Sequence, residues 1–239
     1  MIGNRFQLIR WVLQLVHCLL LLIVIFGCGQ TDSPTQTELV EEDLPIGLTQ
    51  DVFRSQRYIF QLADLPVENW QIETVTNADT VDAFLNWESI FGGKIKFNDV
   101  DSMLLLQPKG QPFIRSLTEV FGQKIPHIFV WVEKQTISDV SNTEDLVNTI
   151  LEIMKLIYPP ESFEVVDQGR IHSQDRVVGD FYTLKWENGN YDKKAVFMRP
   201  TGNTFYLYHI DLWTLTKDEF QQFESEYNQI LENLIFRLQ

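Results

Sequence analysis

Cysteine is almost absent from this chain: its 239 residues include only two, Cys18 and Cys28. Every residue after Cys28 is free of thiols, so the rest of the chain has no disulfide framework, no thiolate zinc site and no cysteine nucleophile. In an oxidising compartment, such a thiol-free domain must be held together by its packed core alone.

Basic residues are also scarce, with 19 lysines and arginines against 33 acidic residues and a formal net charge of −14. A strongly acidic surface repels nucleic acids and anionic lipid headgroups, which excludes a nucleic-acid-binding protein. The same charge keeps a protein in solution beside a membrane and leaves room for a basic protein partner or for cations.

The most apolar run of the chain lies near its N-terminus and ends at Cys28. Arg5 and Arg10 are the only charged side chains before it, and residues 11–26 are almost wholly apolar. A basic start, an apolar centre and a small residue at the cleavage position are the parts of a secretory signal peptide. The run is shorter than the ~20 apolar residues that comfortably span a bilayer.

The segment Ile25–Cys28 resembles the lipobox at which bacterial lipoproteins are cleaved and lipidated. Gly27 and Cys28 fit that pattern, whereas Phe26 is bulkier than the small residue usual there. The resemblance implies a signal peptide over residues 1–27, lipid on Cys28, and an extracytoplasmic protein anchored to a bacterial membrane. The alternative is an uncleaved transmembrane anchor with a buried thiol; in both cases the two arginines keep the N-terminus inside.

The remainder divides into a tether and a domain. Residues 28–43 are polar and acidic, which predicts a flexible tether. Loss of residues 1–27 would remove two arginines and no acid, so the net charge would fall from −14 to −16. Apolar and aromatic residues return at residue 44 and persist to the end, so 44–239 is predicted to be a single globular domain of roughly 195 residues.

Alternating apolar residues bounded by turn residues predict a series of strands. Asn188-Gly189 is a strong hairpin signal, and Pro200–Asn203 predicts a second turn. The segment Thr204–Leu212 is apolar on both faces apart from two polar residues, as in a central strand buried on both sides. The predicted strands are 57–62, 70–75, 103–107, 127–133, 163–166 (ending at 167–169), 176–186, 191–199 and 204–212. In strand 191–199, alternation places Ala195, Phe197 and Arg199 on one face and Lys194, Val196 and Met198 on the other.

Helical spacing and capping residues predict the helices. Asn142 or Ser141 opens one that runs to Ile157, before two prolines. Thr216 and Glu219 form a capping box for an amphipathic C-terminal helix that runs to about residue 236. Residues 80–91 are a further candidate helix, and 113–121 are ambiguous. The order of elements predicts an α+β fold whose mostly antiparallel sheet is covered by helices.

Several of these elements carry a family resemblance. They are Trp70 on an early strand, 127–133 followed by the helix 142–157, the bend 163–169, the strand opening 179–182, the aromatic strand 205–212 and the acidic C-terminal helix. In this order they resemble the PsbP/DcrB-like superfamily. The resemblance implies an α/β/α sandwich and a non-enzymatic accessory or scaffold role on a larger membrane assembly, which for some members is photosystem II. No photosystem-binding motif matches residue by residue, so no functional position is carried over.

Residues of catalytic or metal-binding type are dispersed. His127, His172 and His209 lie in separate elements at no metal-ligand spacing. A hydrogen-bonded histidine in the core or on a sheet face is the favoured interpretation of each. We therefore predict no catalytic, cofactor-binding or metal-binding residue.

Two local patterns partly match known functional motifs, a calcium-binding loop and a serine-based catalytic group. Residues 98–102 have acids at calcium-loop spacing but lack the third acid, the turn glycine and the terminal glutamate of an EF-hand. Ser173 has a histidine beside it and Asp175 and Asp180 nearby, but no nucleophile elbow. An Asx-rich turn and a polar loop are the favoured interpretations.

Trp213 follows a predicted strand end beside a turn, and it is the candidate for an exposed contact with a partner protein. The leading hypothesis is a lipid-anchored accessory or binding protein that docks on a membrane or envelope complex. The alternatives are an envelope hydrolase with dispersed acids around His172 or His209, and a carrier of a small ligand or lipid in an apolar cavity.

Overall fold

The computed structural model describes residues 47–75, 100–117, 119–120, 125–136, 142–202 and 204–236. The chain divides into two units, Met1–Leu44 and Pro45–Gln239, and the described residues all belong to the second. Cys28, the predicted signal peptide and tether, and the candidate helix 80–91 lie outside the described residues. Neither of the helices α4 and α5, which the structure does describe, is long and apolar enough to cross a membrane.

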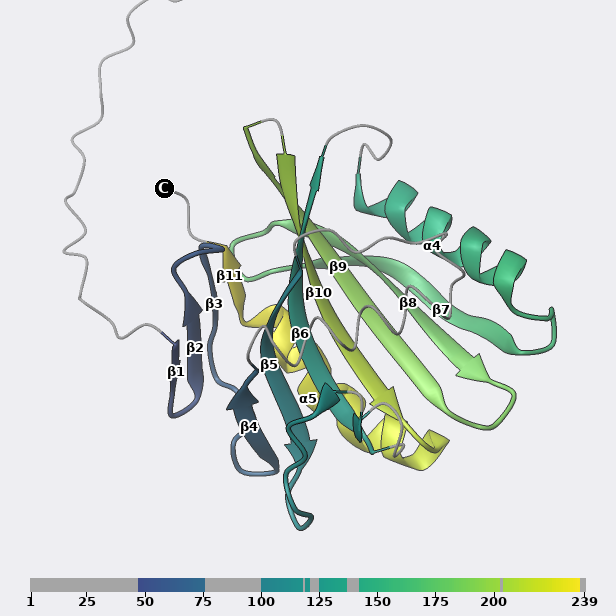
Figure 1. Ribbon diagram of the computed structural model, residues 1–239, viewed down its shortest axis with the longest axis horizontal. Coiled ribbons are helices and arrows are strands. Elements are labelled where there is room, and N and C mark those ends of the chain that lie inside the picture. Colours follow the sequence, from purple (N-terminus) through teal and green to yellow (C-terminus); the bar gives the residue numbers. More distant parts are fainter. Residues whose placement is uncertain are drawn as a thin grey trace, which may run out of the picture. The chain divides into compact units, whose positions relative to one another are not determined.

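A seven-stranded sheet forms the centre of the second unit (Figure 1). Its strand order is β4-β5-β6-β10-β9-β8-β7, and each neighbouring pair is antiparallel. The central position of β10 agrees with the prediction for residues 204–212, because strands pair on both of its sides. The strands are β4 (Trp70–Thr74), β5 (Val100–Pro108), β6 (His127–Thr136), β7 (Phe163–His172), β8 (Val178–Trp186), β9 (Tyr191–Thr201) and β10 (Thr204–Thr214).

A second sheet of four strands adds to the predicted architecture. Its order is β1-β2-β3-β11, so the last strand of the chain pairs with one of the first. Its inner side chains join the same core as the large sheet, where Phe236 packs against Phe197 and Tyr208. The strands are β1 (Gly47–Thr49), β2 (Val52–Ser55), β3 (Phe60–Leu62) and β11 (Leu234–Phe236).

Two helices cover opposite faces of the large sheet, α4 (Thr143–Ile157) and α5 (Lys217–Glu232) (Figure 1). The helix α4 packs Val147 and Leu151 against Leu184, whereas α5 packs against the face that carries Ala195 and Phe197. The alternation predicted for strand β9 explains this division, since Val196 joins a cluster on the α4 face. The α+β fold and its α/β/α layering are therefore confirmed.

Both predicted helix starts are present. Asn142 is the N-cap of α4, and its side chain accepts a hydrogen bond of 2.8 Å from the backbone nitrogen of Asp145. Thr216 and Glu219 form the reciprocal capping box of α5. Each cap satisfies a backbone N–H group that has no partner within the first helical turn.

The prediction for the end of the C-terminal helix was wrong. The helix α5 ends at Glu232, where Asn233 is the C-cap and donates its backbone N–H to the carbonyl of Gln229. The next three residues form β11 instead of another helical turn, because pairing with β3 places Leu234 and Phe236 in the core.

Several strand boundaries also differ from the predictions. The strand predicted to end at 167–169 continues as β7 to His172. A bulge between Val165 and Asp167 shifts its register with β8, and the pairing with β8 then continues to the end of the strand. Strand β9 includes Pro200 and Thr201, and the strand expected over 57–62 begins only at Phe60, after Ile59 at a φ of 55°.

Candidate functional site

Two of the three candidate histidines, His127 and His172, lie far apart in the large sheet, one buried and the other exposed. His127 on β6 is buried, and its Nδ1 lies 2.7 Å from the carbonyl oxygen of Ile125. Burial lowers the pKa of His127 to about 4, so the ring is neutral at physiological pH. His172 is exposed on β7, four strands away from β6 in the sheet order.

The third histidine, His209, is buried on β10 and stacks on Trp131. Its Nε2 lies 3.7 Å from a carboxylate oxygen of Glu133. Burial lowers the pKa of His209 to about 3, which outweighs the opposite effect of Asp211. The described residues thus do not bring the three histidines together.

The residues near Ser173 serve a structural connection. The Ser173 hydroxyl donates to Oδ1 of Asp175 at 2.6 Å, and Oδ2 of Asp175 accepts from the backbone nitrogen of Phe236 at 2.9 Å. Asp180 is separate from them and accepts a hydrogen bond from the hydroxyl of Thr143 in α4. These contacts fix a turn to β11 and a helix to the sheet, in agreement with the interpretation as ordinary polar residues.

No group of three or more metal-ligating side chains gathers within the described part of the chain. Asn98 and Asp99 of the calcium-like pattern lie outside it, and residues 100–102 belong to β5. The calcium interpretation of this pattern is therefore not tested.

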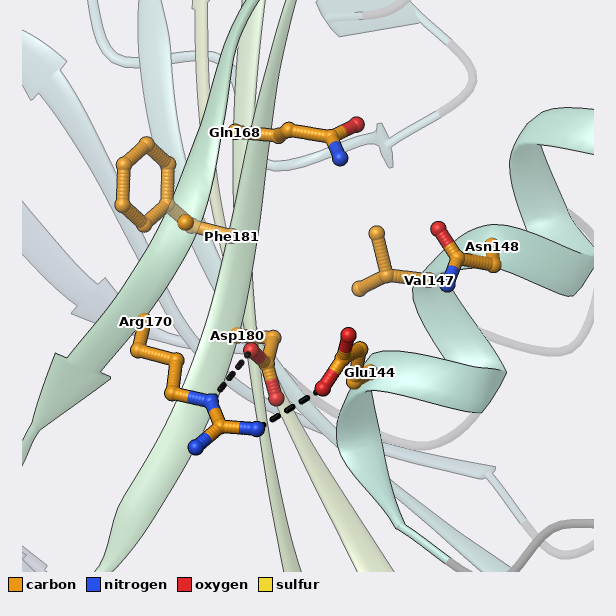
Figure 2. A pocket seen from close by; sticks show the side chains of 8 residues that line it. Glu144, Val147, Asn148, Gln168, Arg170, Asp180 and Phe181 are labelled. Atoms are coloured by element: carbon orange, nitrogen blue, oxygen red, sulfur yellow. Dashed lines mark hydrogen bonds and ion pairs between the residues drawn. The ribbon is translucent and has the colours of Figure 1, made fainter.

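A surface groove of about 290 Å³ runs between α4 and the strands β7 and β8 (Figure 2). Figure 2 shows the guanidinium of Arg170 directed toward two acids, Glu144 and Asp180. A guanidinium nitrogen donates to Glu144 at 2.7 Å, and Nε lies 3.9 Å from Asp180. The lining side chains Asn148 and Gln168 are polar, so the groove does not resemble the apolar cavity that a lipid carrier would need.

Half-buried aromatic side chains gather at the end of the large sheet where α4 finishes. We call this group the aromatic cluster: Tyr158, Phe163, Trp186 and Trp213. The ring centroids of Trp186 lie 5.3 Å from Tyr158 and 6.2 Å from Trp213. Clustered, partly exposed tryptophan and tyrosine side chains are typical of protein contact surfaces.

Trp213 lies within β10, not beyond its end as predicted, because the strand continues to Thr214. It pairs across the sheet with His127 on one side and Asp192 on the other. Acidic side chains flank the aromatic cluster in the chain: Glu161 and Glu187 are exposed, and the backbone nitrogen of Glu187 donates to the carbonyl of Ser162.

A group of charges lies beside the aromatic cluster on the α4 face of the sheet. Lys194 Nζ lies 3.1 Å from Oδ2 of Asp211, and the same oxygen accepts a hydrogen bond of 2.9 Å from Trp131 Nε1. Asp192 is the second acid, and it has no hydrogen bond or ion pair among the described residues. Burial raises the pKa of Asp192 to about 7, with Asp211 adding to this effect and Lys194 opposing it.

The sequence interpretation did not single out Asp192. A signal for it is nevertheless present in the sequence, because alternation along the strand places Lys194 on the same face as Val196 and Met198. Asp192 is two residues earlier on the same strand and therefore shares that face.

No protein-family model matches the sequence, and no curated protein matches it. Among solved structures, the fold is similar to the solution structure of cyanobacterial PsbP (CyanoP) from Synechocystis sp. PCC 6803, with a TM-score of 0.45 and 12% identity over 78% of this chain and 91% of that chain. It is also similar to the crystal structure of the protein of unknown function PA94 from Pseudomonas aeruginosa, with a TM-score of 0.39 and 10% identity over 61% of this chain and 88% of that chain.

Proposed function

We propose that this chain is a lipid-anchored, extracytoplasmic accessory protein that docks on a basic partner in a membrane or envelope complex. Its second unit is the binding module, and the aromatic cluster is the centre of its docking surface. The protein carries out no catalysis in this proposal, and its role is to recruit or stabilise another protein at the membrane.

The observation that carries the docking proposal is the aromatic cluster around Trp213. Four large rings lie against one another while each keeps part of its surface exposed. Such side chains contribute much of the binding energy at protein interfaces when a partner covers them. The acidic charge of the chain, −14 overall, favours a basic partner through long-range attraction.

The sequence supports the membrane attachment. The lipobox-like segment Ile25–Cys28 follows an apolar run, and an acidic stretch separates it from the described unit. Two lipid chains or more give stable attachment, whereas one chain binds only weakly and reversibly. Lipid on Cys28 would hold the docking surface near its partner.

Membrane attachment is tested by the substitution Cys28→Ala in the full chain. We expect the wild-type protein to sediment with membranes and to incorporate a radiolabelled fatty acid, and the variant to incorporate none. A variant that still carries label would overturn the assignment of Cys28. An unlabelled wild-type protein that stays with membranes would favour the uncleaved transmembrane anchor.

Docking is tested by affinity capture from solubilised native membranes with the full chain and its Trp213→Ala variant. We expect a protein partner with the wild type and a loss of about tenfold or more with the variant. Val178→Ala is the matched control, since Val178 is an apolar residue of β8 that is 45% exposed, at the end of that strand away from Trp186. Trp213→Phe and a thermal melt separate lost contact from unfolding. Equal capture by the wild type and the Trp213→Ala variant would overturn the proposal.

A further inference from the structure

We propose that Asp192 is the binding position for a lysine or arginine side chain of the partner, which would lie against Trp213. This inference rests on the proposed docking function and names the chemistry that the docking surface recognises. Asp192 is the acid of the charge group that has no ion pair among the described residues.

The charge group contains one lysine and two acids on the same face of neighbouring strands. Lys194 and Asp211 are opposite each other in the β9–β10 pairing and form the ion pair of 3.1 Å. Asp192 lies two residues from Lys194 along β9 and is left without an ion pair or hydrogen bond from the described residues. A partly buried carboxylate in this state gains more from an incoming cation than a fully hydrated one.

The neighbour of Asp192 suits a cation as well. Asp192 and Trp213 are direct cross-strand partners, so their side chains leave the sheet on the same face with Cβ atoms about 5 Å apart. The face of an indole ring attracts lysine and arginine side chains through its quadrupole. A cation between the two would contact a carboxylate and an aromatic face at once, and Trp186 lies next to Trp213.

The other charged groups near Asp192 are already committed or neutral. Lys194 lowers the pKa of Asp192 while Asp211 raises it, and the nearby hydroxyls of Tyr158 and Tyr182 both have a raised pKa and stay protonated. Arg170 in the groove of Figure 2 is held by Glu144 and Asp180 and lies on another strand. Within the charge group, Asp192 is therefore the acid that has no ion pair among the described residues.

Protonation of Asp192 would compete with the partner's cation. Burial places the pKa of this carboxyl at about 7, so it is mostly charged at about pH 8 and mostly neutral at about pH 5.5. Cation binding should accordingly be tighter at the higher pH, with a proton released on binding at intermediate pH.

The experiment uses isothermal titration calorimetry of the full chain in a neutral detergent with a capped peptide of about six lysines. We expect Asp192→Asn to weaken binding by about fivefold or more at about pH 8 and to remove its dependence on pH between about 5.5 and 8. Glu68→Gln is the matched control, because Glu68 is exposed, precedes β4 at the opposite edge of the sheet, and loses the same charge. It should change the affinity by less than about twofold.

Equal weakening by Asp192→Asn and Glu68→Gln would overturn the inference, because the peptide would then sense only the overall charge. The same holds if the wild-type affinity is unchanged between the two pH values. Capture of the native partner separates this inference from the docking proposal. If Trp213→Ala loses the partner and Asp192→Asn retains it, only the inference about Asp192 fails; if neither variant loses it, the docking proposal fails.

Discussion

His209 stacks on Trp131 with the ring centroids 3.7 Å apart and the ring planes 5° from parallel. Neither ring nitrogen of His209 has a hydrogen-bond partner within the described part of the chain, although the side chain is buried. His127 differs, because its Nδ1 is in hydrogen-bond contact with the carbonyl oxygen of Ile125. The two buried histidines therefore form a natural pair for comparison.

We predict that His209→Phe leaves the free energy of unfolding within about 1 kcal/mol of the wild type at about pH 8, because the ring stack is kept and no hydrogen bond is lost. His127→Phe should destabilise by ~1–3 kcal/mol, since it removes the ring nitrogen that contacts the carbonyl of the half-buried Ile125. Urea denaturation followed by circular dichroism measures both values. A larger loss for His209→Phe than for His127→Phe would contradict this account.

A second prediction concerns acid. The pKa of His209 is about 3 in the folded protein against an ordinary value of 6.5, so only the unfolded chain takes up this proton between those values. Stability from this group is complete above about pH 6.5 and is lost as the pH falls towards 3. We expect His209→Phe to reduce the slope of unfolding free energy against pH between about 6 and 4. An unchanged slope would show that His209 is not the titrating group.

Local signals were the part of the fold that the sequence could predict. Thr216 with Glu219 started a helix, and Asn188-Gly189 formed a turn in which Gly189 has a φ of +90°, a conformation that glycine adopts without strain. Each signal acts through neighbouring residues. Tertiary packing was not required to interpret it.

The end of the C-terminal helix could not be predicted in this way. Leu231 and Leu234 continue the helical spacing, yet Leu234 belongs to β11 because a partner strand from the other end of the chain is available. For the candidate site, the sequence could indicate only that Trp213 is an aromatic residue near a turn. The Asp192 carboxylate lacks a cationic partner because Lys194 pairs with Asp211, and only the strand register decides which acid Lys194 contacts.

Close backbone packing at Gly179 leads to a third prediction. A Cβ atom there would lie 2.6 Å from the carbonyl oxygen of Val196 and 2.7 Å from a ring carbon of Phe197. Because β9 supplies this oxygen from its backbone, the contact cannot be relieved by a side-chain rotation. We predict that Gly179→Ala destabilises by ~1–3 kcal/mol, as overpacking of a core does.

Gly169→Ala is the control for this prediction, since its Cβ would lie 3.2 Å from a ring carbon of Phe181, which is half-buried and can shift. Thermal melts of the two variants should show a clearly larger drop in melting temperature for Gly179→Ala. Equal drops would mean that glycine flexibility, and not the contact with Val196, decides the effect.

The two acids beside Lys194 should respond to substitution in opposite ways. Asp211→Asn removes the charge partner of a largely buried lysine, and breaking such a pair costs ~3–5 kcal/mol because the remaining charge stays buried. The pKa of Asp192 is raised from 3.8 to about 7, so this group loses stability as the pH rises from 3.8 through 7. At about pH 8, Asp192→Asn removes that unfavourable charge, and the variant should be at least as stable as the wild type. Urea denaturation of both variants at this pH tests the prediction. Comparable destabilisation by the two variants would mean that Lys194 is shared equally between the two carboxylates. Asp192 would then have no free charge to offer a partner.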